Sequence, residues 1–299
     1  MAYTDIDDPS SAFQTTLYSG NSGSQSIVHD GNSDLQPDWV WCKVRSQSDN
    51  HAIFDSVRGG QKQLRSNTTG AELTRSNAIS SFNSNGFTMG GQPEMNSNGQ
   101  TYVTWNWKKV AGVFDIVGFT GNGNARTISH NLGSVPKFMI IKDRDNVTNW
   151  GTYHVAIGPG KDAGYLNSTV VPEANNNFWN NTAPTASVFS VGTDGTYNGN
   201  GNDYIIYLFG NKQGVSFCGS YTGNGNADGT FVYTGFKPAM VIIKRIDGAD
   251  NWVIYDNKRD GFNGDTHALF PNNGDSQTTD VDIDLVSNGF KIVRASGRV

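Results

Sequence analysis

Hydrophobic positions along this chain come in short runs separated by polar stretches rich in Asn, Gly and Ser. The runs are dominated by β-branched and aromatic residues, as in WVWCKV, KFMIIKD and AMVIIKR. Asn-Gly and Asp-Gly dipeptides, which favour tight hairpin turns, recur between the runs. No stretch shows a sustained helical period. The pattern therefore predicts an all-β protein.

Two runs show which side of a predicted strand is apolar. They are YVTWNWK, which begins at Tyr102, and YIIYLFG, which begins at Tyr204. Alternate residues of a strand point to the same side, and here one side is apolar in both runs: Val103, Trp105 and Trp107, then Ile205, Tyr207 and Phe209. Apolar faces of this kind pack against a second sheet, so we expect antiparallel β-sandwiches.

Matching landmarks recur about every hundred residues. The sets are Tyr18, Phe119 and Tyr221; Pro37, Pro136 and Pro238; and Phe87, Phe189 and Phe290. A period of this length is a domain rather than a solenoid repeat. We therefore predict three tandem β-sandwich domains in a row, over residues 13–110, 111–212 and 213–299, after an N-terminal arm of residues 1–12.

A glycine-rich stretch, YTGNGNADGT from Tyr221, resembles a phosphate-binding loop and has counterparts at Phe119 and Tyr18. A phosphate loop must be followed by the N-terminus of a helix. The stretch is instead followed by a strand-like segment, TFVYTGF. We therefore interpret it as a hairpin turn after the first strand of each domain.

The third domain lacks a visible counterpart of the runs at Tyr102 and Tyr204. Each of those runs begins 15 residues after the phenylalanine landmark, Phe87 or Phe189. The same offset from Phe290 gives residue 305, beyond Val299. Either the natural product is longer, which is the interpretation we favour, or a partner donates the strand to an open edge.

Composition narrows the function classes. The formal net charge is −5, and Lys and Arg are scattered, so we expect no nucleic-acid partner. No apolar run is long enough to span a bilayer, and the start, MAYTDIDDPSS, does not have the pattern of a signal peptide. The chain is expected to fold in a cytoplasm and to have no membrane-inserted segment.

The residues that could carry chemistry give no recurring constellation. Cys42 and Cys218 sit at non-equivalent places, so no disulfide is expected. The histidines show no metal-ligand spacing, and no Glu recurs between domains. The carboxylates of TTDVDIDLV alternate with apolar residues, as in a half-buried strand, rather than forming a calcium loop: Asp280, Asp282 and Asp284. We predict no catalytic residue, cofactor or metal.

Two groups of residues are candidates for ligand contact. A lysine follows each landmark proline by six residues, at Lys43, Lys142 and Lys244, and it either covers apolar surface with its stem or binds an acidic sugar. Three tryptophans, Trp150, Trp179 and Trp252, are the others. Trp150 and Trp252 follow Asn, and Trp179 lies in the polar stretch NNNFWNNT, where it either stacks on a sugar or caps an adjoining domain.

The first domain resembles a domain found repeatedly in structural proteins of tailed bacteriophages, particularly marine cyanophages. The resemblance spans nearly all of residues 6–108 and rests on IDDPSSAFQTTLYSGN, DGNSDLQPDWVWCKVRS, HAIFDSVRGG, LRSNTTGAE, SFNSNGFTMGG and NSNGQTYVTWNWK. Residues 111–299 are similar to the same group more loosely. The likeness implies a jelly-roll or lectin-like sandwich in a virion component, and it implies no catalytic residues.

Our expectation is therefore a non-enzymatic structural protein on the virion surface, made in the host cytoplasm. It would be a tail fibre, adhesin or capsid decoration protein. Its expected partners are other virion proteins, further copies of itself (a trimer if it is a fibre) and host-surface glycans. A free array of carbohydrate-binding modules and a polysaccharide depolymerase are the alternatives.

Overall fold

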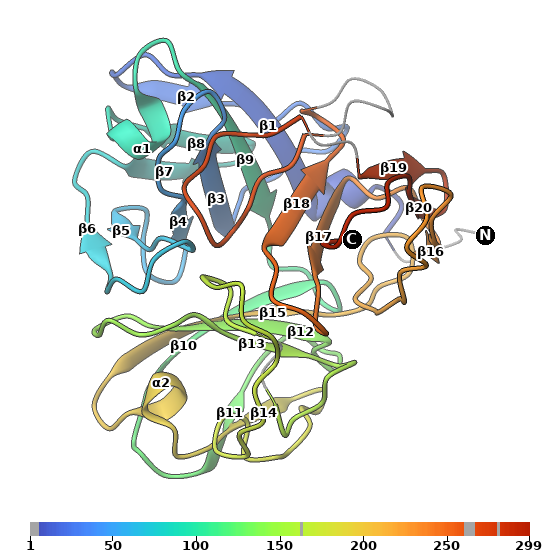
Figure 1. The fold of residues 1–299 in the computed structure, drawn as a ribbon. Coiled ribbons are helices and arrows are strands. Elements are labelled where there is room, and N and C mark those ends of the chain that lie inside the picture. Colours follow the sequence, from blue (N-terminus) through green and yellow to red (C-terminus); the bar gives the residue numbers. More distant parts are fainter. Residues whose placement is uncertain (1–5, 162–163, 260–266, 280–281) are drawn as a thin grey trace.

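The computed structural model describes residues 6–161, 164–259, 267–279 and 282–299 (Figure 1). The protein is all-β and is built from several antiparallel sheets, as the sequence predicted. Helical structure in the described ranges is limited to a 3₁₀ turn, η1 (Pro9–Ser11), and two single turns, α1 (Pro93–Asn96) and α2 (Gly195–Asn198). None of these could cross a membrane. We call residues 6–110, 111–212 and 213–299 the first, second and third units.

The first unit contains a four-stranded sheet with the order β1-β9-β3-β4 and a three-stranded sheet with the order β2-β8-β7. A short pair, β5-β6, lies beside them. The strands are β1 (Phe13–Ser19), β2 (Gln25–Ile27), β3 (Trp39–Val44), β4 (Ala52–Asp55), β5 (Lys62–Gln63), β6 (Leu73–Thr74), β7 (Ile79–Asn83), β8 (Gly86–Met89) and β9 (Thr101–Trp107).

The second unit repeats this plan with the sheet β10-β15-β12-β13 and the pair β11-β14. Its strands are β10 (Phe114–Thr120), β11 (Arg126–Ser129), β12 (Phe138–Asp143), β13 (Gly151–His154), β14 (Val188–Val191) and β15 (Asp203–Phe209). The third unit has the pair β17-β18 and the sheet β16-β20-β19. Its strands are β16 (Phe231–Tyr233), β17 (Met240–Lys244), β18 (Trp252–Asp256), β19 (Ile283–Val286) and β20 (Gly289–Ile292).

Each unit has an apolar core between its two sheets. In the first unit, Val40 and Tyr102 of the larger sheet meet Ile79, Phe87 and residues near them on the smaller one. The second and third units have their own cores of the same kind. The fold is therefore sandwich-like, because apolar faces of two antiparallel sheets pack on each other.

The opposite faces of the larger sheets meet in a cluster shared by all three units, which we call the central cluster. Its members include Trp39 and Trp105 of the first unit, Phe138 and Tyr207 of the second, and Trp252 of the third. Figure 1 shows the units grouped around this centre, the first in blue to teal, the second in green to gold and the third in orange to red. The units therefore share one core and do not form the row that we expected.

The glycine-rich stretch is not a hairpin, which corrects the sequence interpretation. β1 pairs with β9 and β2 pairs with β8, so the loop between them passes from one sheet to the other. Glycine is required there because a Cβ on Gly20 would lie 2.2 Å from the Ser97 carbonyl oxygen. The buried Asn96 side chain fixes the loop, accepting from the Asn21 N–H at 2.8 Å and donating to the Gly23 carbonyl at 2.7 Å.

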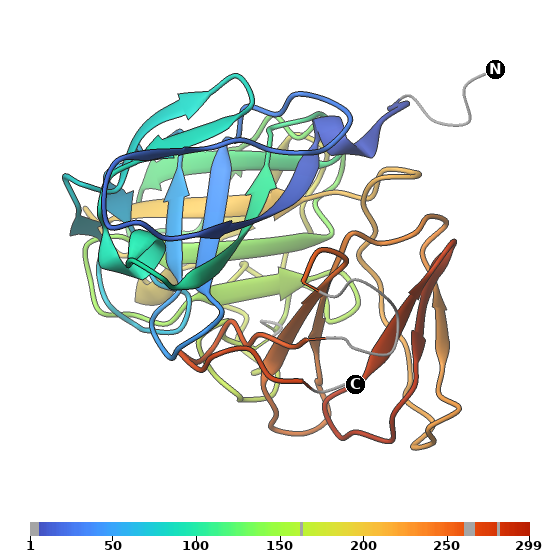
Figure 2. The same cartoon turned by 90° about the horizontal axis from the view of Figure 1, so that it is seen from above.

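The described part of the N-terminal arm is folded onto the first unit. The Asp8 carboxylate caps η1 by accepting from the Ser10 N–H at 2.9 Å and also accepts from the Ser33 hydroxyl at 2.7 Å. Ile6 packs against the central cluster. Residues 6–12 therefore contact the rest of the first unit at the edge of the molecule (Figure 2).

Candidate functional site

One position makes the same contact in every unit, and this contact joins the units. The Trp150 indole N–H donates to the Arg65 carbonyl at 2.9 Å, and the Trp252 indole N–H donates to the Tyr165 carbonyl at 3.0 Å. At the matching place in the first unit, His51 Nε2 lies 3.0 Å from the Phe270 carbonyl. The second unit thus bonds to the first, the third to the second, and the first to the third.

A second set of hydrogen bonds follows the same cycle. The main-chain N–H groups of Thr148, Asp250 and Asp49 donate to the carbonyls of Thr69, Thr169 and Gly274, respectively, at 2.8 to 3.1 Å. Each donor lies just before β13, β18 or β4, and each acceptor lies in a loop of the neighbouring unit. The three interfaces, which we call the junctions, are therefore built alike and close into a ring.

The tryptophans proposed for ligand contact lie inside the protein. Trp150 is 0% exposed and Trp252 is 4% exposed, because both fill junctions. Trp179 is 1% exposed and packs against Tyr153 and Tyr197 in the second unit's core. Stacking on a sugar requires an open ring face, so none of the three indoles offers a glycan platform in this conformation.

The recurring lysines are also turned inward. Lys43 and Lys142 are fully buried, and their ammonium groups donate to nearby carbonyls: Val44 for the first, and Asp143 and Asn146 for the second. Burial lowers the pKa of each of these two lysines to about 8. The half-buried Lys244 donates to the Asp250 carbonyl of its own unit and, across a junction, to the Thr169 carbonyl of the second unit. These amines bind backbone rather than present charge to a ligand.

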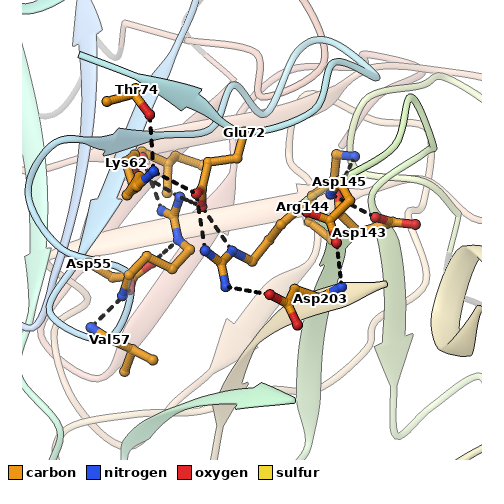
Figure 3. Close-up of polar contacts among 12 residues, drawn as sticks. Asp55, Val57, Lys62, Glu72, Thr74, Asp143, Arg144, Asp145 and Asp203 are labelled. Atoms are coloured by element: carbon orange, nitrogen blue, oxygen red, sulfur yellow. Dashed lines mark hydrogen bonds and ion pairs between the residues drawn. The ribbon is translucent and has the colours of Figure 1, made fainter. Parts of the chain in front are cut away.

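The junction between the first and second units contains a network of charged groups (Figure 3). Arg144 grips the Glu72 carboxylate with two hydrogen bonds, at 2.9 and 3.0 Å, and Arg58 reaches the same carboxylate at 3.2 Å. Burial pushes the pKa of Glu72 upward, but Arg144 and Arg58 outweigh it, so this pKa lies below its ordinary value. Glu72 therefore stays ionised and acts as a clamp between units.

A buried Asp-Arg pair continues this network into the central cluster. The Asp55 carboxylate accepts from Arg58 Nε at 2.6 Å and from the Tyr207 hydroxyl of the second unit at 2.8 Å. In the third unit Asp256 accepts in the same way from Arg259 Nε at 2.6 Å and from the Trp105 indole N–H of the first unit at 3.0 Å. The recurrence of Asp-x-x-Arg in FDSVR and YDNKR is the sequence signal for these pairs, and the expectations stated above did not include it.

The second unit has His154 and Ile157 at the places of the Asp and the Arg, and both line a pocket of about 990 Å³. Its wall includes Trp39, Phe138 and Trp252 of the central cluster, together with residues 214–223 and β17. Burial lowers the pKa of His154. The lining residues named here are largely apolar, and the pocket adjoins all three units.

The other histidine, cysteine and aspartate side chains that were considered for chemistry make structural contacts. His29 lies 2.8 Å from the Thr16 hydroxyl, and burial lowers its pKa to about 4. Burial raises the pKa of Cys42 to about 12, so this thiol is protonated at neutral pH. Asp282 is buried beside Tyr255 and Arg298, whereas Asp280 lies outside the described residues. Among the side chains that the structure describes, no group of three could hold a metal ion.

Comparison with known proteins gives one family. A family described as "Domain of unknown function (DUF7483)" matches residues 8–299. No curated protein and no solved structure matches the chain. The family match runs through all three units and includes every junction described above. The chain therefore belongs to the DUF7483 family.

Proposed function

We propose that this protein is a non-enzymatic structural component on the exterior of a tailed-phage particle, either a tail fibre or adhesin or a capsid decoration protein. The finer fold that we propose is three β-sandwich units of jelly-roll or lectin-like type. The resemblance of residues 6–108 to phage structural domains supports the setting, and the ring of units supports a structural role.

The main support for a structural role is that polar side chains form hydrogen bonds between the units. Those that recur between units, at positions 51, 150 and 252 and at positions 55 and 256, bond across junctions. Buried and fully bonded groups of this kind fix one arrangement of a core. A ring of three units is then a rigid body that presents three sets of outer loops. Such a body suits repeated contacts on a particle.

The proposed partners follow from this role. They are other virion proteins, host glycans at the outer loops and, for a fibre, two more copies of the chain. Since the lysines and tryptophans considered above are buried or bonded to backbone, a glycan would have to meet other residues of those loops.

Immunogold labelling of intact phage particles tests the proposal, with an antibody raised against the folded protein. Gold over the head would indicate a decoration protein, and gold confined to the tail would indicate a fibre or adhesin. Particles that remain unlabelled by an antibody shown to bind the native protein would contradict a place on the virion. Release of reducing ends from host polysaccharide by the purified protein would favour a depolymerase instead.

A further inference from the structure

The first and second units each have a central strand in the larger sheet that is the last strand of the unit. β9 lies between β1 and β3, and β15 lies between β10 and β12. Trp107 of β9 pairs with Phe13 on one side and Trp39 on the other. Phe209 of β15 pairs in the same way with Phe114 and Phe138. The two central strands therefore have one register relative to their neighbours.

In the third unit the two flanking segments are present, but the described residues include no strand between them. β17 is the counterpart of β3 and β12, and it pairs with β18. Residues 216–222, the counterpart of β1 and β10 by sequence offset, form no named strand. Since β1 and β10 take all their sheet pairing from β9 and β15, a flank without its central strand has no partner to pair with.

The pocket of about 990 Å³ lies where that strand would run. It is lined by residues 214–223 on one side and by residues 240–244 of β17 on the other. Burial differs between the units at the same place: every residue of β3 and β12 is buried, whereas Met240, Ile242 and Lys244 of β17 are only partly buried. Phe217 is 46% exposed. The walls are therefore apolar surfaces that a strand would cover.

The cycle of contacts between units points to the same place. Tyr207 of β15 bonds to Asp55 of the first unit, and Trp105 of β9 bonds to Asp256 of the third. The corresponding residue of a third central strand would meet His154 of the second unit, and His154 lines the pocket. One strand would thus fill the sheet of the third unit and complete the third buried contact of the ring.

We propose that this pocket is the binding site of a seven-residue β-strand, the third-unit counterpart of β9 and β15, which enters antiparallel to β17 and pairs on its other side with residues 216–222. The strand has bulky apolar side chains at alternate positions directed to the central cluster, as Val103, Trp105 and Trp107 are. Main-chain hydrogen bonds on both edges give it affinity, and the pockets for alternate side chains give it specificity. Residues 296–299 line the same pocket. We assign the site to a strand with the apolar alternation of β9 and β15.

A synthetic peptide tests the site in the protein as it stands. The peptide copies residues 98–109, NGQTYVTWNWKK, which include β9, and the control peptide has the change Thr104→Pro, which breaks strand pairing. Hydrogen exchange at residues 216–222 and 240–244 should slow about tenfold or more with the first peptide and stay unchanged with the second. Exchange in β3 and β12, whose sheets are complete, serves as the internal reference.

A covalent version tests the register. The chain is extended after Val299 by a copy of residues 198–210, which places a copy of β15 at the offset of 102 residues seen between the second and third units. Tyr207 pairs with Ile116, whose counterpart is Cys218. With Tyr207→Cys in the copied segment, oxidised glutathione should convert the two thiols into a disulfide with Cys218, because directly opposed residues have suitable spacing. With Ile206→Cys in the copied segment instead, the side chain faces the other way and should not react with Cys218.

The peptide and the extension are judged by the same criteria. Slower exchange at both flanks in either format supports the strand site, and selective bonding to Cys218 supports the register. If neither the peptide nor the extension slows exchange at residues 216–222 and 240–244, the pocket is not a strand site. A disulfide from the Ile206→Cys copy but not from the Tyr207→Cys copy would overturn the proposed register.

Discussion

An imidazole and two indoles make the same junction hydrogen bond, at His51, Trp150 and Trp252. His51 Nδ1 accepts from the Trp41 indole N–H at 2.8 Å, so its proton must lie on Nε2 when the ring is neutral. Burial holds the pKa of His51 well below its ordinary value, which keeps the ring neutral. Its Nε2–H therefore donates to the Phe270 carbonyl, as the two indoles donate to theirs. What the units share at this position is a buried N–H donor rather than a residue type.

The value of that donor can be measured at Trp150. Trp150→Phe removes the hydrogen bond to the Arg65 carbonyl and leaves that carbonyl only the Thr68 N–H at 3.4 Å, so we expect the free energy of unfolding to fall by about 0.5 to 1.5 kcal/mol beyond the loss of ring volume. Trp179→Phe is the matched control, because the buried Trp179 indole nitrogen has no hydrogen-bond partner among the described residues. Urea unfolding of both variants gives the comparison. Equal losses would show that the junction hydrogen bond contributes nothing measurable.

The buried lysines predict an unusual dependence of stability on pH. Lys43 has a pKa of about 8 in the folded protein, because burial disfavours its charge, whereas an unfolded lysine titrates near 10.4. Between these values the unfolded chain binds more protons, so the unfolding free energy rises with pH. From pH 7 to pH 9 we expect a rise of about 1 kcal/mol in the wild type relative to Lys43→Met.

Lys108→Met, at an exposed position, is the control for the lysine experiment. It should follow the wild-type pH profile. A Lys43→Met profile parallel to that of the wild type between pH 7 and pH 9 would mean that Lys43 keeps an ordinary proton affinity in the folded state.

At the scale of elements, alternation in YVTWNWK identified the correct face but not its partner. Val103, Trp105 and Trp107 do share an apolar face, yet that face packs in the central cluster rather than between the two sheets of its own unit. The other face, through Tyr102, fills the core of the first unit. A strand's period states which side chains point together, and it carries no information on what lies across from them.

The loops show a similar limit. Asn-Gly dipeptides favour tight turns, which led us to expect a hairpin after the first strand of each unit. The partner of β1 is instead β9, some eighty residues later in the chain, and the glycine serves a close approach of two backbones. Turn chemistry is local, whereas strand pairing here is set by the sequence-distant apolar faces.

The junction between the first and second units should depend on Glu72. Glu72→Gln removes the charge that Arg144 and Arg58 share, and we expect a loss of about 1 to 3 kcal/mol in unfolding free energy at neutral pH. Since the pKa of Glu72 is lowered in the folded state, its stabilisation is present above the ordinary carboxyl pKa and is lost as pH falls through the folded value. The difference in unfolding free energy between wild type and variant should therefore become smaller as the pH falls.

Asp30→Asn is the comparison for Glu72→Gln. It removes an ion pair with Lys258 that also joins two units, but both side chains are largely exposed. Exposed pairs contribute about 0 to 1 kcal/mol, so this change should be close to neutral. If the loss of unfolding free energy in Glu72→Gln is the same at neutral and acid pH, the charge of Glu72 does not stabilise the junction.

At the scale of the whole molecule, the recurring offsets identified the three units but not the ring that they form. The landmarks lie within units, and nothing in their spacing states that residue 51 meets residue 270. The burial of Trp150 and Trp252 could not be predicted for the same reason, because each indole bonds to a carbonyl of the neighbouring unit. Trp179, by contrast, is covered by the core of its own unit.

The shared centre predicts that the units unfold together. Separating them would expose Trp39, Trp105 and Trp252, and each large apolar side chain brought to water costs about 1.5 to 3 kcal/mol. Calorimetry should therefore show one transition, and tryptophan fluorescence and circular dichroism should report the same midpoint. Distinct transitions for separate parts of the chain would show that the central cluster does not couple them.

The closure of the ring has a consequence for folding during synthesis of the protein. The first unit obtains its junction partners at Phe270 and Gly274 only after the chain has been made as far as those residues. At ribosomal speeds of about 5 to 20 residues per second, synthesis of the stretch from Trp107 to Phe270 takes on the order of 10 to 30 s. During that time the part of the first unit's tryptophan-rich face that meets the third unit, with Trp105, stays uncovered. Newly made copies are therefore prone to join each other across these faces, and the yield of folded protein should depend on how well chaperones shield the first unit until the third arrives.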